Sequence, residues 1–218
     1  EIRNCDWSSD VCSSDLIGQT DIWVTGERIA AMESALGNLG GNLPHEEMNL
    51  NGAYVFPGFI DTHVHLTGGG GEAGPETRVP PVQLTSLSTA GVTTCVGVLG
   101  TDGTTRTVRD LVATTLGMRR LGLNAYCYTG SYEYPVPTLT GSVRDDIVFI
   151  EPIVGVGELA ISDHRSSQLT LAEFGRVASD AYTAGLMSGK AGVLHIHMGD
   201  GPREFALIEE ALRVFEIP

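Results

Sequence analysis

From residue 57 onward, short apolar runs alternate with segments of helical periodicity. With the run that begins after Pro57 they make five βα units, with apolar runs at 92–99, 123–129, 153–161 and 192–198 and helical segments at about 106–121, 143–150, 171–187 and 202–215. Repeated βα units predict a parallel sheet covered by helices, so the expected fold class is α/β. A closed barrel needs eight such units, so five predict an open sheet or part of a (β/α)8 barrel.

Two of the predicted helices carry recognisable start signals. Thr104 and Thr105 precede the helix at 106–121 and are expected to cap it. Pro202 opens the last helical segment, where the missing N–H of proline would be tolerated.

The N-terminal part of the chain has a different pattern, that of a small β domain. Two short β patterns, 21–25 and 28–32, flank a turn and predict a hairpin. Residues 48–56 alternate again, which predicts a further strand.

The first residues of the chain fit neither period and repeat Ser-Ser-Asp. We interpret residues 1–16 as a non-native or disordered segment. The expected domains are therefore this segment, a small β domain at 17–56 that forms part of a sandwich, and the βα units at 57–218.

Net charge and cysteine content indicate which partners and which cellular setting to expect. A formal net charge of −14 argues against nucleic acid and anionic membranes, which select basic patches. The long uncharged run at 79–101 holds two prolines and many Ser and Thr, so no membrane span is predicted. The four cysteines lack CxxC spacing and no leader pattern opens the chain, so a cytoplasmic setting is expected.

A pair of histidines at the end of the first predicted strand indicates a metal site. Side chains two apart on a strand share a face, so His63 and His65 can present two imidazoles to one cation. Four glycines at 68–71 follow, which allow a ligand to approach the backbone, and Glu72 adds a carboxylate.

Other strand ends supply similar residue types, and active sites of parallel βα folds collect there. Glu158 lies on the fourth predicted strand, where a buried carboxylate is costly unless it is paired or bound to metal. The fifth strand offers His195 and His197 on the same face. Either histidine could be a ligand, and the other a core histidine with a backbone partner.

Pro57-Gly58-Phe59-Ile60-Asp61 with His63 and His65 is similar to the opening metal motif of the amidohydrolase superfamily, metallohydrolases on a distorted (β/α)8 barrel. More narrowly, the segments 65–72, 100–102, 129–132, 162–165 and 197–200 resemble, in this order, those of the isoaspartyl (β-aspartyl) dipeptidase family. The resemblance covers roughly residues 20 to 218. It implies a zinc-dependent omega peptidase with two metal ions that acts on small β-aspartyl dipeptides through a metal-activated hydroxide, and a homo-oligomer when intact.

The resemblance also implies metal ligands. His63 and His65 would bind the more buried ion, and His197 the second. Many members bridge the ions with a carboxylated lysine on the fourth strand, where this chain has Glu158. The sole lysine is Lys190, in a Ser-Gly-Lys-Ala-Gly turn, so Glu158 is expected to bridge instead, since a carboxylate also offers two oxygens.

Substrate contacts follow from the same resemblance. Glu72 would take the α-amino group of the substrate, helped by the backbone of Gly70 and the region of Thr101. Tyr132 would polarise the scissile carbonyl. Arg165 would pair with a substrate carboxylate, although a bridge to Asp163 on its own loop is an equal reading.

The resemblance places a further metal histidine and a catalytic aspartate on later strands, which are not among these residues. We therefore expect a truncated dipeptidase that is inactive in this form. Two alternatives stay open: a cyclic amidase similar to dihydroorotase or hydantoinase, and a non-catalytic half-barrel. The glycine segment, residues 68–71, with Glu72 directly after it, argues against a cyclic amidase, since cyclic amides carry no free α-amino group.

Overall fold

The computed structural model describes residues 17–35 and 44–217. The chain forms two compact units, Glu1–Pro57 and Gly58–Pro218, which are described separately. The segment 1–16, predicted to be non-native or disordered, lies outside the described residues.

The first unit contains the predicted hairpin. Strands β1 (Asp21–Thr25) and β2 (Arg28–Glu33) pair antiparallel around a turn in which Gly26 has φ of 59°. The strand predicted at 48–56 is wrong, because these residues form no ladder and Met48 is 84% exposed. Alternation describes two faces of a segment, but a strand also needs a hydrogen-bonding neighbour.

The second unit is built on a five-stranded sheet, as the sequence predicts. All neighbouring strands are parallel and lie in chain order. The strands are β3 (Phe59–Val64), β4 (Val92–Gly97), β5 (Asn124–Thr129), β6 (Ile153–Ile161) and β7 (Val193–Met198).

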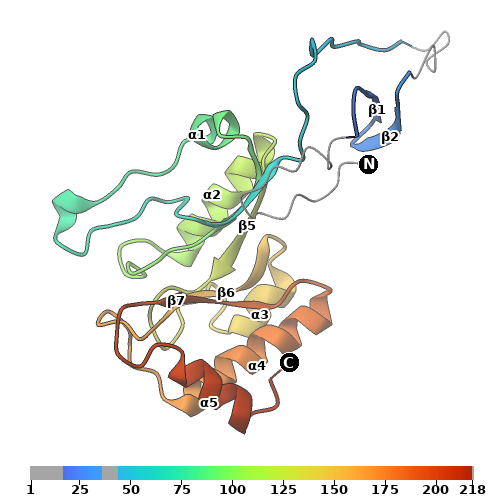
Figure 1. The fold of residues 1–218 in the computed structure, drawn as a ribbon. Coiled ribbons are helices and arrows are strands. Elements are labelled where there is room, and N and C mark those ends of the chain that lie inside the picture. The colour runs from blue at the N-terminus through green and yellow to red at the C-terminus, as the bar shows by residue number, and fades with distance from the viewer. Residues whose placement is uncertain (1–16, 36–43, 218) are drawn as a thin grey trace. The chain divides into compact units, whose positions relative to one another are not determined.

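Helices connect these strands and cover one face of the sheet (Figure 1). They are α1 (Leu84–Thr89), α2 (Val108–Arg120), α3 (Val143–Phe149), α4 (Leu171–Ser188) and α5 (Ala206–Val214), with a short 3-10 turn η2 (Pro75–Thr77) after the glycine segment. The fully buried core between the two layers includes Leu66, Leu99, Leu111, Ile147, Ile153 and Leu159. No helix in the described ranges is long and apolar enough to cross a membrane.

The sheet curls into a half-barrel. In a flat five-stranded sheet the outer strands would lie about 19 Å apart, since neighbours are spaced by about 4.8 Å. Yet Nδ1 of His63 on β3 lies 2.9 Å from Nε2 of His195 on β7. The curl brings the inner faces of the two outermost strands together, and with them the predicted site residues.

Two predicted helix starts are wrong. Helix α2 is capped by Thr107, whose side chain accepts from the N–H of Asp110, and not by Thr104 and Thr105. The N–H groups of those two threonines bond to Asp102 instead, in a loop that shapes the site. Helix α5 begins at Ala206, four residues after Pro202, because turns occupy the intervening residues.

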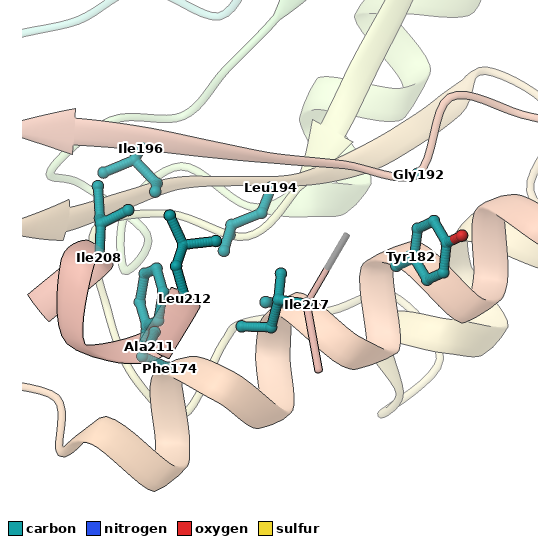
Figure 2. A pocket seen from close by; sticks show the side chains of 10 residues that line it. Phe174, Tyr182, Gly192, Leu194, Ile196, Ile208, Ala211, Leu212 and Ile217 are labelled. Carbon is teal, nitrogen blue, oxygen red and sulfur yellow. The ribbon is translucent and has the colours of Figure 1, made fainter. Parts of the chain in front are cut away.

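An apolar hollow of about 290 Å³ lies beside the β7 edge and is lined by Phe174, Ala178, Tyr182, Gly192, Leu194, Ile196, Ile208, Ala211, Leu212 and Ile217. Figure 2 shows Leu194 and Ile196 pointing from β7 into it. Its lining side chains are apolar apart from the hydroxyl of Tyr182, so it offers packing surface and no catalytic groups.

Candidate functional site

Three side chains form a compact metal-type group: one on β3, one directly after β3 and one on β6. One ligand atom from each of His63, His65 and Glu158 lies within 4.8 Å of the others. Nε2 of His63 is 3.3 Å from Nε2 of His65, and Oε2 of Glu158 is 3.4 Å from the first nitrogen and 3.9 Å from the second. The curl of the sheet brings β6 opposite the end of β3 and so assembles the group.

The carboxylate in this group fits a cation. Glu158 is 1% exposed, and its Oε2 atom is buried without a hydrogen-bond partner. An anionic oxygen left in that state is costly. Two imidazole nitrogens and one such oxygen form a donor set that suits a divalent ion such as zinc.

The ring of His65 is held in place by the next strand end. A Cβ on Gly100, which has φ of +74°, would lie 2.5 Å from Cε1 of His65, so only glycine allows this packing. Burial lowers the pKa of His65 below its ordinary value, although the Glu158 carboxylate opposes the shift. The ring is therefore neutral at pH 7, which is the form that binds metal.

The other oxygen of Glu158 faces a different histidine. Oε1 lies 2.9 Å from Nδ1 of His197, and the Tyr132 hydroxyl lies 2.7 Å from the same nitrogen. His197 does not belong to the group of three. Glu158 thus lies between the pair His63 and His65 at Oε2 and the single histidine His197 at Oε1.

The bridge between Arg165 and Asp163, which the sequence left open, is present in the structure, whereas the contact of Asp163 with His197 was not predicted. The side chain of Asp163 is 2% exposed, and Oδ2 accepts from Nε2 of His197 at 3.1 Å. It also accepts two side-chain hydrogen bonds from Arg165, which lower the pKa of the Asp163 carboxyl. The signal that could have identified Asp163 as a site residue is its spacing, since it stands two residues before Arg165 at the end of β6.

Arg165 reaches from this loop to the glycine segment. Its Nη1 donates to Oε1 of Glu72 at 3.1 Å, and its guanidinium lies 5.2 Å from the ring centre of Tyr132. Thr101 donates to the same Glu72 oxygen at 2.8 Å, and this bond is the main cause of the lowered pKa of Glu72. Glu72 therefore remains ionised and can accept a substrate ammonium group.

The sequence left His195 open as a metal ligand or as a core histidine with a backbone partner. In the structure its Nε2 lies 2.9 Å from Nδ1 of His63, and its ring stacks on Tyr128 with the ring centres 5.0 Å apart. The curl of the sheet, which places β7 opposite β3, brings these side chains together. His195 thus engages the nitrogen of His63 that faces away from His65 and Glu158.

The predicted site residues thus converge. A cavity of about 560 Å³ is lined by His63, His65, Gly70, Glu72, Thr101 and Tyr132, among others. Contacts link Glu158, His197 and Arg165 to the same group. Outside it lies His164, whose side chain is 82% exposed.

Comparison with known proteins agrees with this geometry. A family model described as the amidohydrolase family matches residues 46–109. A solved β-aspartyl dipeptidase from Fervidobacterium islandicum AW-1 is 42% identical, with a TM-score of 0.83 over 93% of this chain and 55% of that one. The chain belongs to the β-aspartyl dipeptidase family of the amidohydrolase superfamily.

A second solved structure of a β-aspartyl dipeptidase from the same organism holds a β-Asp-Leu dipeptide. It is 50% identical to this chain, with a TM-score of 0.73 over 74% of this chain and 44% of that one. The chain thus spans about half the length of the β-aspartyl dipeptidases that it matches. Within that half it has the family's curled parallel sheet and a His/Glu cluster that could hold a metal ion.

Proposed function

We propose that the protein to which this chain belongs hydrolyses the isopeptide bond of β-aspartyl dipeptides in a metal-dependent reaction. One observation carries the proposal: the two histidines of the metal-type group, His63 and His65, line the same cavity as the acidic side chain of Glu72. A cation site beside an amine-binding carboxylate suits an amide substrate with a free ammonium group. The β-Asp-Leu bound to the Fervidobacterium relative has this chemistry.

We assign His63, His65 and Glu158 to one metal ion, and Glu158 with His197 to a second. The support is the geometry of the Glu158 carboxylate, whose two oxygens face different histidines. We propose zinc because the donor set is imidazole and carboxylate. When bound, such an ion lowers the pKa of a water to about 7 and polarises a carbonyl group.

The substrate is bound at both of its charged ends. Glu72 accepts the α-amino group, next to Thr101 and the backbone of Gly70, and Arg165 pairs with a carboxylate. In the structure Glu72 and Arg165 contact each other at 3.1 Å. When a dipeptide binds, its ammonium group takes the place of Arg165 beside Glu72, and its carboxylate takes the place of Glu72 beside Arg165. The charges of Glu72 and Arg165 therefore both remain paired.

Tyr132 supplies a hydrogen bond to the scissile carbonyl. Burial raises the pKa of its hydroxyl, and the Glu158 carboxylate raises it further. The phenol therefore stays protonated at neutral pH and donates to the oxygen on which negative charge develops. Among residues 17–35 and 44–217 we assign no side chain to the transfer of a proton to the leaving amine.

We further propose that residues 1–218 by themselves do not turn over substrate, because the resemblance assigns that proton transfer to an aspartate on a later strand. Residues 17–56 are proposed to belong to a β-sandwich, and the whole protein to be a homo-oligomer in the cytoplasm. The cytoplasmic setting is supported by Cys95 and Cys127, which are free thiols.

The test is an assay of the full-length gene product, with zinc, against β-Asp-Leu. N-acetyl-β-Asp-Leu is the matched control, because it keeps the isopeptide bond and lacks the ammonium group. Dihydroorotate and hydantoin test the cyclic amidase alternative. We expect cleavage of β-Asp-Leu and at least a 100-fold lower kcat/KM for the acetylated dipeptide, while turnover of a cyclic amide alone would reject the proposal.

A further inference from the structure

The glycine segment beside Glu72 is held by one buried arginine. Arg106 stands two residues before helix α2 and is only 3% exposed. Its Nε donates to the carbonyl of Thr67 at 3.2 Å, its Nη2 to that of Gly69 at 2.7 Å and its Nη1 to that of Gly70 at 3.2 Å. A single planar guanidinium therefore fixes three carbonyls of the segment 67–70.

The charge of Arg106 is balanced on the loop after β4. Nη1 of Arg106 lies 3.2 Å from Oδ2 of Asp102. Asp102 in turn accepts from the N–H groups of Thr104 and Thr105 at 3.1 and 2.7 Å. Arg106 and Asp102 thus join the glycine segment to this loop through a buried, charge-assisted network.

The glycine segment has a defined conformation in this network. Gly68 and Gly70 have φ of +87° and +63°, and a Cβ at either position would lie within 2.7 Å of the carbonyl oxygen of Val79 or Thr77. In a trans peptide unit the C=O and N–H groups point in opposite directions. Since Arg106 binds the Gly69 carbonyl, the N–H of Gly70 is directed away from the guanidinium.

A hydrogen bond between Thr101 and Glu72 also links the glycine segment to the loop after β4. Glu72 follows the glycine segment directly, and Thr101 precedes Asp102 in the loop. Thr101 donates to Glu72 at 2.8 Å. The distance between the segments, which Arg106 sets, therefore decides where the Glu72 carboxylate stands relative to the metal-type group.

We propose that Arg106 is a positioning residue for recognition of the substrate's ammonium group, acting through Glu72 and the backbone of Gly70. This inference rests on the proposed function and extends it to a residue that touches neither the substrate nor the metal-type group. Arg106 bonds to none of His63, His65 or Glu158 in the structure. Its loss is expected to weaken binding of the amine end of the substrate and to affect metal binding much less.

The test compares Arg106→Met and Arg106→Lys in the full-length enzyme, with Arg109→Met as the matched control. Arg109 is an exposed arginine three residues further along the chain. The substrates are β-Asp-Leu and N-succinyl-leucine, which is the same molecule without the α-amino group. We expect Arg106→Met to raise KM for β-Asp-Leu at least 10-fold, to change kcat less than 3-fold and to leave KM for N-succinyl-leucine within 2-fold.

Two further readouts separate positioning from a general loss of structure. Arg106→Lys keeps the charge and one donor group, so its KM should lie between those of the wild type and Arg106→Met. In a Glu72→Gln background, Arg106→Met should raise KM by a smaller factor than it does in the wild type, because only the contribution through the backbone of Gly70 remains. An equal loss with both substrates, or full additivity with Glu72→Gln, would overturn the proposal.

The inference and the proposed function can fail separately. If the wild-type enzyme cleaves no β-Asp-Leu, the proposed function is rejected. Hydrogen exchange of the backbone amides in residues 68–72 then still tests Arg106. Exchange at least 10-fold faster in Arg106→Met than in Arg109→Met supports the positioning role, and unchanged exchange rejects it.

Discussion

Asp163 binds one edge of the Arg165 guanidinium with both carboxylate oxygens, Nε donating to Oδ1 at 2.9 Å and Nη2 donating to Oδ2 at 2.7 Å. The same carboxylate accepts from His197. One buried side chain therefore orients a proposed substrate-binding group and a proposed metal ligand. Groups that orient ligands in this way typically contribute 10- to 100-fold to affinity or activity.

The first prediction concerns this double role. Asp163→Asn keeps the shape of the side chain but removes its charge, so Arg165 loses the more buried of its two charged partners, Asp163 and Glu72. We expect kcat/KM for β-Asp-Leu in the full-length enzyme to fall about 10- to 100-fold, as expected for orienting groups. Asp200→Asn, an exposed acid after β7, is the control, and an equal loss there would contradict the assignment.

The second prediction concerns the metal-type group. Glu158→Gln is nearly isosteric, but it replaces a buried anionic oxygen with a weaker, neutral ligand. We expect the affinity of the chain for zinc, measured by calorimetric titration at pH 7.5, to fall at least 100-fold. His164→Ala removes an exposed histidine outside the group and should leave the affinity unchanged. Full zinc binding by Glu158→Gln would reject Glu158 as a ligand.

The third prediction compares two glycines. Gly100→Ala places a Cβ 2.5 Å from the His65 ring, so the ring must move and zinc affinity should fall more than 10-fold. At Gly117, inside α2, an added methyl group would meet no other atom within 4 Å, and the backbone is ordinary helix. Gly117→Ala should therefore raise the free energy of unfolding by about 0.5–1 kcal/mol and leave zinc affinity unchanged.

Part of the site could be predicted from the sequence because strand ends converge in parallel folds. The pair His63 and His65, Glu72 after the glycines, and Glu158 on an apolar strand each departed from the surrounding pattern in a way that packing alone does not explain. The roles proposed for them remain predictions, but the structure brings all four to one place.

The contacts of His195 and Arg106, and that of Asp163 with His197, could not be predicted, because each depends on geometry that one segment does not encode. The contact between His195 and His63 follows from the curl of the whole sheet. The bonds of Arg106 depend on which carbonyls the glycine segment turns inward. The failed strand at 48–56 has the same cause, since its alternation says nothing about a neighbouring strand.

The fourth prediction concerns the pH dependence of two buried thiols. Burial raises the pKa of Cys95 from 9.0 to about 11 and that of Cys127 from 9.0 to about 12. Only the thiolate reacts with iodoacetamide, so at pH 8 the native thiols should react about 100-fold and about 1000-fold more slowly than in the urea-unfolded chain. Peptide mapping after timed alkylation measures both rates, and equal rates for Cys127 in the two states would contradict its burial.

The same shifts fix the sign of a stability change. Well below pH 9.0 both thiols are neutral in the folded and unfolded states, so stability is unaffected there. Above that value the unfolded chain loses protons that the native chain retains, and stability falls as the pH rises. The loss should be smaller in a Cys95→Ala, Cys127→Ala variant.

The last prediction concerns Lys190, the sole lysine. Its Nζ donates to the carbonyls of Ile147, Ile150 and Ile153 at 2.6, 2.8 and 3.0 Å, which joins the end of α3 to the start of β6. Glu158 lies five residues after Ile153 on the same strand, about 16 Å from it at the usual rise of a strand. Lys190 is therefore a brace at the opposite end of the sheet from the candidate site.

Lys190→Met keeps the length of the side chain and removes all three donated bonds. Hydrogen bonds from a charged group are worth more than neutral ones, so the free energy of unfolding in urea should fall by about 2–3 kcal/mol. Arg176→Met, at an exposed position of α4, is the control and should change it by less than about 0.5 kcal/mol. Zinc affinity should be the same in both variants, and its loss in Lys190→Met alone would mean that the brace also shapes the site.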